Sequence, residues 1–221
     1  MKIAIIGTGN VGRAFGGSLV RAGHEVTLAA RDEVKTRTVA GELGASAAST
    51  PREAAKDVDV VVLAVPFESA AEQVARDLLP VATGKVVIDV TNPIKPDFSG
   101  LLTEGGPSAA ERIAEWLPNA RVVKAFNTLF ASIQGDPDIH GTELDALYAT
   151  DDEEARTTTA RLISSIGFRP IDVGQLVRAR ELEGLAWLNM QLQVRHEGDW
   201  RSAFSLVGAP SRAIATPVAS R

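Results

Sequence analysis

The chain has 221 residues, a formal net charge of −5 and no cysteine. A chain of this length buries a sizeable core without disulfide or metal staples, and the lack of cysteine excludes thiol nucleophiles and cysteine metal sites. The acidic balance, with no basic run interleaved with aromatic residues, argues against a nucleic-acid surface, so no nucleic-acid partner is expected. The three histidines are scattered without metal-ligand spacing, and no metal site is predicted.

The first predicted strand, residues 2–6, runs into the sequence Gly7-Thr8-Gly9-Asn10-Val11-Gly12, and a helical pattern follows. This spacing is typical of a dinucleotide-binding turn. Gly7 permits the tight turn, Gly9 lets the backbone approach a diphosphate, and Gly12 lets the helix pack closely on the strand. The N–H groups at the start of that helix would face the phosphates. The alternative is an ordinary strand-to-helix turn that holds no ligand.

The second strand is predicted over residues 25–30, and its end indicates which dinucleotide is preferred. Ala30 occupies the position where NAD-preferring domains carry an acidic residue that holds the ribose hydroxyls. Arg31 follows, with Lys35 close behind, and such cations suit the charge of a 2′-phosphate. NADP is therefore preferred over NAD. Two alternatives stay open: the cations are solvated charges on a surface helix, or Asp32 is a displaced ribose ligand.

Strands and helices then alternate with the spacing of βαβ units. Thr50, Pro51 and Glu53 predict a helix start, with Thr50 as the cap and Glu53 completing a capping box. The alternation predicts an α/β fold of the Rossmann type, a doubly wound and mainly parallel sheet with helices on both faces. The predicted strands are 45–47, 60–65, 85–90, 121–126, 146–149 and 169–173, and the predicted helices are 69–79, 109–116 and 152–166.

The chain carries no recognisable targeting or membrane segment. Its longest apolar run, residues 58–66, is interrupted by Asp59 and is far shorter than the roughly 20 residues that span a bilayer. Because the first strand begins at Met1, no room is left for a signal peptide before the fold. A cytoplasmic protein without a membrane partner is expected.

Beyond residue 174 the pattern changes to a helix over 176–194. Its apolar residues are leucines at helical spacing, and two interpretations remain open: it packs on its own sheet, or it helps form a homodimer and closes the substrate side. Residues 1–174 are predicted to form the NADP-binding domain and 175–207 a helical segment packed on it. The segment 208–221, rich in Ala, Ser and Pro, is expected to be a disordered tail. The leucines are Leu176, Leu182, Leu185, Leu188 and Leu192.

Ligands of open parallel sheets lie over the carboxyl ends of the strands. Asn92 and Asn127 follow two such strands, and their amides suit a ribose or a carboxamide, although each alone is equally typical of a turn or helix cap. Phe67 is expected against the ring system of a substrate. No catalytic acid or base is identified, since Tyr148 has Asp152 where short-chain dehydrogenases need lysine. Redox chemistry remains feasible if the second substrate is itself an electron sink.

Six sequence motifs, in order, resemble the NADPH-dependent F420 reductase family of bacteria and archaea. They are also similar to the cytosolic NADPH-binding domain of the STEAP metalloreductases. The resemblance covers residues 1–206, nearly the whole chain. The motifs are Ile5–Gly12, Ala30–Asp32, Val62–Pro66, Asp89–Pro93, Val122–Asn127 and Gly167–Gly174.

The resemblance implies hydride transfer between NADP(H) and the deazaflavin coenzyme F420, or a flavin, with the two rings stacked. Alternatives for the acceptor are a small carbonyl or imine or a flavin-metal substrate, and a nonenzymatic NADP(H) sensor is the third possibility. Ala30 departs from the serine of the archaeal F420 enzymes. The Thr-Asn-Pro turn and the Phe-Asn pair make the chain more similar to the metalloreductase domain than to those enzymes. By motif, Gly7, Thr8, Gly9, Asn10 and Val11 would hold the diphosphate, Arg31 and Lys35 the 2′-phosphate, and Val65, Pro66, Asn92, Ala125 and Asn127 the nicotinamide.

Overall fold

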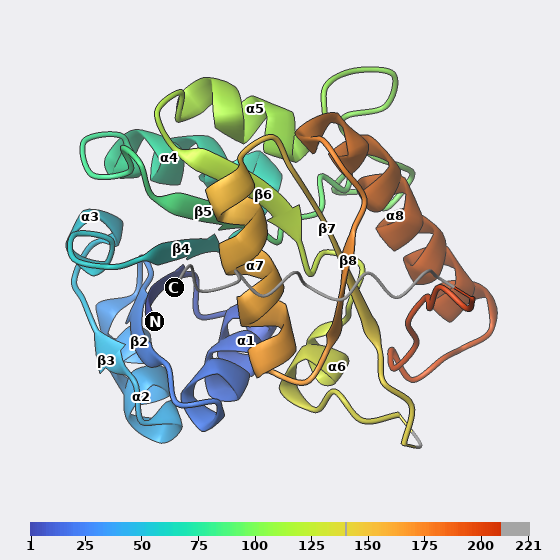
Figure 1. Cartoon of the computed structure of the whole chain (residues 1–221), viewed down its shortest axis with the longest axis horizontal. Helices are drawn as coiled ribbons and strands as arrows, with labels where there is room; N and C mark the ends of the chain where they lie inside the picture. Colours follow the sequence, from blue (N-terminus) through green and yellow to red (C-terminus); the bar gives the residue numbers. More distant parts are fainter. Residues whose placement is uncertain (140, 209–221) are drawn as a thin grey trace, which may run out of the picture.

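A computed structural model describes residues 1–139 and 141–208, so the predicted tail after residue 208 lies outside the described residues. Its centre is one eight-stranded sheet with the order β3-β2-β1-β4-β5-β6-β7-β8 (Figure 1). All neighbouring strands pair in parallel except β6 and β7. The predicted doubly wound, mainly parallel α/β sheet is thus confirmed. The strands are β1 Lys2–Ile6, β2 Glu25–Ala29, β3 Ser46–Ala47, β4 Val60–Leu63, β5 Val86–Asp89, β6 Arg121–Ala125, β7 Asp145–Thr150 and β8 Arg169–Asp172.

Helices cover both faces of the sheet because its strands are apolar on both sides. One face packs against α1 (Asn10–Arg21), α2 (Glu33–Leu43), α6 (Ala131–Gly135) and α7 (Glu153–Ser165). The other packs against α3 (Pro51–Ala54), α4 (Glu72–Leu78), α5 (Ala109–Trp116) and the start of α8 (Ala179–Arg195). Figure 1 shows α8 at the right of the view, beyond β7 and β8. Among the described residues, no helix combines the length and the apolar character needed to cross a membrane.

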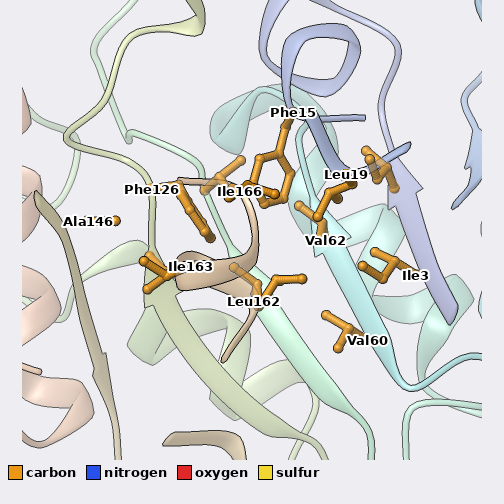
Figure 2. Close-up of a cluster of buried hydrophobic side chains, with 14 of the residues drawn as sticks. Ile3, Phe15, Leu19, Val60, Val62, Phe126, Ala146, Leu162, Ile163 and Ile166 are labelled. Atoms are coloured by element: carbon orange, nitrogen blue, oxygen red, sulfur yellow. The ribbon is translucent and has the colours of Figure 1, made fainter. Parts of the chain in front are cut away.

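The two cores follow from the alternation of side chains along each strand. In β1, Ile3 and Ile5 face the layer of α1 and α7, whereas Ala4 and Ile6 face the opposite layer. Figure 2 shows part of the first core, where Phe15 of α1 lies close to Phe126. The two ring centres are 4.5 Å apart. This contact joins the first helix to the residue that follows β6.

Local details differ from the expectations at two helix starts. The helix predicted from residue 69 begins earlier, with one turn of π-helix at Phe67–Ala71, called the π-turn below, that leads into α4. At the start of α3, the Thr50 hydroxyl accepts the Glu53 N–H as predicted, but the Glu53 carboxylate accepts the N–H of Ser49. The predicted capping box is therefore wrong by one residue, because the carboxylate reaches past the cap.

The C-terminal helix buries a different face from the one its leucines suggested. A short 3₁₀ turn, Leu176–Arg178, precedes α8. The buried face of α8 contains Leu182 and Ala186 together with three polar residues, while Leu188 and Leu192 are 50% and 37% exposed. The leucines thus do not form one buried stripe. The buried polar residues are Glu183, Asn189 and Gln193.

Candidate functional site

The segments that follow the parallel strands meet at one edge of the sheet. Register aligns Ile6 with Ala29 on one side and with Leu63 on the other, and Leu63 in turn with Asp89. The order of the strands reverses between β1 and β4, which is the switch point where open α/β sheets bind their ligands. The glycine turn therefore lies at this crevice, between the segments that follow β2 and β4.

The glycines of the first turn are required for different steric reasons. Gly7 has a φ of 122°, and a Cβ there would lie 2.1 Å from the carbonyl oxygen of Ala64. A Cβ on Gly12 would lie 2.1 Å from the carbonyl oxygen of Gly7. Gly9, in contrast, has a φ of −75° and no heavy atom within 4 Å of its Cβ position. Two glycines thus close the turn, and the third leaves open space above it.

That open space lies at the N-terminus of α1, a helix of twelve residues. Gly9 is the N-cap, and no side chain in the described part of the chain caps it. The first intrahelical bond runs from Arg13 N–H to the Gly9 carbonyl, so the preceding N–H groups of the first turn have no backbone acceptor. Donors at a helix N-terminus, next to space that a side chain would fill, suit a phosphate group. The predicted residues Thr8, Asn10 and Val11 belong to this turn.

The cations predicted to bind the 2′-phosphate lie where the chain leaves β2. Arg31 and Lys35 are exposed, and within residues 1–139 and 141–208 neither side chain has an ion-pair partner. Asp32 is the N-cap of α2, and its carboxylate accepts the N–H of Lys35 at 2.9 Å. One oxygen of Asp32 is thereby used in capping. Arg31 and Lys35 are therefore the groups of this segment that suit an anionic ligand.

Asn92 and Asn127 are brought together from two neighbouring strands. Asn127 Nδ2 donates to Asn92 Oδ1 at 3.0 Å and to the Leu182 carbonyl at 3.0 Å, while Asn92 Nδ2 donates to the Asn127 carbonyl at 2.9 Å. These two acceptors fix the orientation of the Asn127 amide. Its Oδ1 is buried and has no hydrogen-bond partner in the described structure. The pair thus keeps one unused acceptor, which suits an amide donor such as a carboxamide.

The backbone before Asn127 is strained. Phe126 has a φ of 61°, a left-handed conformation that bulky residues rarely adopt. Its fully buried ring packs against Phe15, which holds this conformation in place. Such strain, stored at the end of a strand, is common at functional sites. Ala125, the last residue of β6, is buried, whereas Val65 is half-buried and Pro66 is exposed after β4.

Two aromatic residues from the sequence analysis lie in the hydrophobic cores. Phe67 is buried and stacks on Trp116, with ring centres 5.9 Å apart. The expectation that it contacts a substrate ring is therefore wrong, because the π-turn directs it into the core. Tyr148 is buried as well, and burial raises its pKa to about 12. It stays neutral inside the first core.

The sequence analysis missed a charged cluster below the amide pair, which we call the charge network: Lys124, Asp89 and Glu183. Asp89 and Lys124 are register partners on β5 and β6, and Glu183 comes from α8. All three are essentially fully buried, with exposures of 0%, 0% and 1%. Burial lowers the pKa of Lys124, but the two carboxylates outweigh it and raise that pKa. Burial raises the pKa of Glu183. The signal available in the sequence was an acidic residue, Asp89, in the largely apolar strand β5 and a basic residue, Lys124, in the largely apolar strand β6.

A cavity of about 500 Å³ opens at the opposite edge, where β1, β5 and β6 begin. It is lined by Met1, Lys85 and Arg121 among others, and Arg121 is paired there with Glu154 at 2.8 Å. None of the predicted site residues lies in it. No cluster of His, Cys, Asp or Glu that could hold a metal ion occurs among the residues that the structure describes.

Comparisons with known proteins find similar sequences and a similar fold. The family model described as "NADP oxidoreductase coenzyme F420-dependent" matches residues 2–93. A crystal structure from Arthrobacter sp. FB24, provisionally assigned as an F420 dependent NADP-reductase, superposes with a TM-score of 0.83 at 29% identity, covering 93% of this chain and 100% of that one.

Curated relatives are longer than this chain. Rat metalloreductase STEAP3 is 30% identical over 191 residues, which is 83% of this chain and 36% of the relative. The uncharacterised oxidoreductase YfjR of Bacillus subtilis is 29% identical over 175 residues, or 79% of this chain and 57% of the relative. The chain thus spans between about a third and somewhat over half of the length of these relatives.

Proposed function

We propose that the chain is an NADP-dependent oxidoreductase that transfers a hydride between NADP(H) and a deazaflavin or flavin acceptor. The match to the family model over residues 2–93 and the similarities to the Arthrobacter structure and to rat STEAP3 support this proposal. The observation that carries the proposal is the turn Gly7–Gly12. It combines open space at Gly9, unpaired N–H donors at the start of α1 and a position at the β1/β4 switch point.

The adenosine end of the dinucleotide is assigned to the segment after β2. In this proposal Arg31 and Lys35 bind the 2′-phosphate, because both are exposed cations without a partner in the described chain. Ala30 offers no carboxylate for ribose hydroxyls, which removes the group that favours NAD. NADP is then held by Coulombic attraction at one end and by backbone donors at its diphosphate.

The nicotinamide end is assigned to the segments after β4, β5 and β6. Val65 and Pro66 form one wall in this proposal, and Asn92, Ala125 and Asn127 form the other. The unused acceptor of Asn127 would take an N–H of the carboxamide and so fix which ring face is presented. When bound, NADPH supplies the hydride. The protein's contribution is alignment of the two rings, since a flavin-type acceptor needs no positioned protein acid to accept a hydride.

The comparisons name two kinds of acceptor. The chain is similar over 83% of its length to a metalloreductase, as well as to a structure assigned to an F420-dependent reductase. The name of the first refers to the reduction of a metal, and that of the second to coenzyme F420 and NADP. The test therefore has to compare acceptors in one assay.

The purified chain is mixed with NADPH and, separately, with F420, FMN and FAD, and NADPH absorbance is followed over time. We expect NADPH oxidation with F420 or with a flavin, and no oxidation without an acceptor. Tight NADPH binding without turnover of any of these acceptors, or of small carbonyls and imines, would indicate a nonenzymatic NADP(H) sensor instead of an enzyme. Failure to bind NADPH in calorimetry would end the proposal.

A further inference from the structure

The charge network lies directly beneath the turn that carries Asn92. Lys124 Nζ uses all three of its protons: it donates to Asp89 Oδ2 at 2.8 Å, to the Thr91 carbonyl at 2.6 Å and to Glu183 Oε1 at 3.1 Å. Asp89 Oδ1 in turn accepts the Thr91 N–H at 2.8 Å. Both backbone groups of Thr91 are therefore held by charged partners. Because Thr91 precedes Asn92, these bonds fix the backbone position from which the Asn92 side chain extends.

The same network reaches the second amide through α8. Glu183 Oε1 accepts the N–H of Ala109, the first residue of α5, and Glu183 Oε2 accepts the Thr103 hydroxyl at 3.0 Å. The residue before it, Leu182, offers its carbonyl to Asn127. Glu183 thus fixes the part of α8 that orients the Asn127 amide. The network and the amide pair form one closed set of contacts between β5, β6 and α8.

Stability alone does not account for this arrangement. Three ionisable groups are removed from water, and two carboxyl groups face one amine. Within the described residues, the other donors to the two carboxyl groups are the N–H groups of Thr91 and Ala109 and the Thr103 hydroxyl. Desolvation of buried ion pairs often cancels their attraction, and apolar replacements of similar size are commonly neutral. A geometric role explains the contacts better, because every bond of Lys124 ends on a group that locates an asparagine.

We propose that the charge network is a positioning device for the nicotinamide half of NADP(H). It locks the turn of Asn92 and the Asn127 amide in one arrangement. The inference rests on the proposed function, since it assumes that these amides face the nicotinamide.

The test uses a triple variant of the full chain, Asp89→Asn, Lys124→Met and Glu183→Gln. Amide oxygens at 89 and 183 keep acceptors for the N–H groups of Thr91 and Ala109, and the Lys124 contact to the Thr91 carbonyl is lost. Affinity is measured by calorimetry for NADPH and for adenosine 2′,5′-bisphosphate, which lacks the nicotinamide half. We expect NADPH affinity to fall about tenfold, equal to about 1.4 kcal/mol, with the affinity of the fragment unchanged within about twofold.

The matched control is the double variant Arg156→Met, Asp172→Asn. Arg156, on helix α7 of the opposite face, also donates to a carboxylate and to a backbone carbonyl. The carboxylate is that of Asp172 on edge strand β8, and the carbonyl is that of Thr150 at the end of β7. This variant should leave both affinities unchanged. Thermal unfolding of each variant is measured alongside. If the triple variant does not fold, Glu183→Gln alone should give a smaller loss that is again confined to NADPH.

Three outcomes are distinguishable. A selective loss of NADPH affinity supports the inference. An equal loss for NADPH and the fragment, or no loss, overturns it while leaving the proposed function standing. Absence of binding of both ligands to the wild-type chain overturns the proposed function itself, and the inference with it.

Discussion

Single residues of the first turn contribute through the space they leave. Gly12→Ala would bring a Cβ against the backbone oxygen of Gly7, so α1 would have to move away from the sheet. Gly9→Ala meets nothing, and its backbone is in an ordinary extended conformation. The first change should therefore lower stability, and the second should act on the ligand.

We expect Gly12→Ala to cost several kcal/mol of unfolding free energy, about 2 to 4, as is typical of overpacking against rigid backbone. Gly9→Ala should cost at most about 1 kcal/mol, the usual difference between N-cap residues, yet abolish measurable NADPH binding. Urea unfolding and calorimetric titration of both variants check this. Wild-type NADPH affinity in folded Gly9→Ala would contradict the assignment of the diphosphate to this turn.

Arg31 should discriminate between the two pyridine dinucleotides. A charge-assisted hydrogen bond is worth about 1.5 to 3 kcal/mol, so Arg31→Ala should weaken NADPH binding about 10-fold to 100-fold and leave NADH nearly unaffected. Arg37→Ala is the control, because Arg37 lies on the same stretch but is paired with Glu33. The dissociation constants of NADPH and NADH, measured for each variant, test this prediction. Equal losses for NADPH and NADH would show that Arg31 does not bind the phosphate.

The role of a residue could be predicted from the sequence where it depends on neighbouring residues. Contacts between residues far apart in the chain could not be predicted. The glycine spacing implies its own turn, and the asparagines were identified because each follows a strand. The charge network needs three segments far apart in the chain, and Glu183 resembles any exposed helical glutamate in sequence. Phe67 was misplaced for the same reason, since the π-turn that buries it has no simple sequence signature.

Among the elements, α5 shows how capping and charge act together. Ser108 and Glu111 form a capping box, and Arg180 donates twice to the Glu111 carboxylate, at 2.6 and 2.8 Å. The hydrogen bonds from Arg180 hold the pKa of Glu111 at about 2, below the ordinary 4.5. The carboxylate thus links α5 to the residues that start α8.

This lowered pKa predicts an acid-dependent loss of stability. A carboxyl whose pKa is depressed in the folded state stabilises above its unfolded pKa, and the contribution is lost as the pH falls from 4.5 towards about 2. The unfolding free energy of wild type relative to Glu111→Gln should fall by about 1 kcal/mol across this window, reduced by the exposure of Arg180. Glu115→Gln on the same helix is the control. A difference that does not change with pH would contradict the prediction.

The elements themselves were largely predictable because their burial is simple. Strand β4 is a continuous apolar run and β5 and β6 are mostly apolar, while α5 and α7 have clear caps, so the bounds of these elements were predicted within a few residues. The helices α2 and α6 were not predicted as such. In α2 only Thr36, Val39 and Ala40 are buried, and α6 has five residues, so neither carries a strong periodic signal.

At the scale of the whole molecule, α8 presents apolar side chains outward. Leu188 and Leu192, one helical turn apart and therefore on one face, are 50% and 37% exposed. Apolar groups that gather on a surface commonly mark an interface. We propose that this face of α8 pairs with a second copy of the chain, in keeping with the homodimer expected from the sequence.

Leu188→Glu should then shift the chain to monomer in sedimentation equilibrium, because a charge would be buried without a partner at the interface. Val34→Glu is the control, since Val34 is 68% exposed on α2, away from α8. We expect the control to sediment as the wild type does. A monomeric wild-type chain at micromolar concentration would contradict the proposal.

The strand order reverses at only one place in the described sheet, between β1 and β4. One crevice admits one dinucleotide, and the chain has no cysteine with which to store electrons between two visits. The proposed ring-to-ring hydride transfer requires donor and acceptor to occupy the protein simultaneously. Initial velocities measured while the NADPH and acceptor concentrations are both varied should give intersecting double-reciprocal plots. Parallel plots would contradict this expectation, because they would mean that the protein is reduced and releases the first product before the acceptor binds.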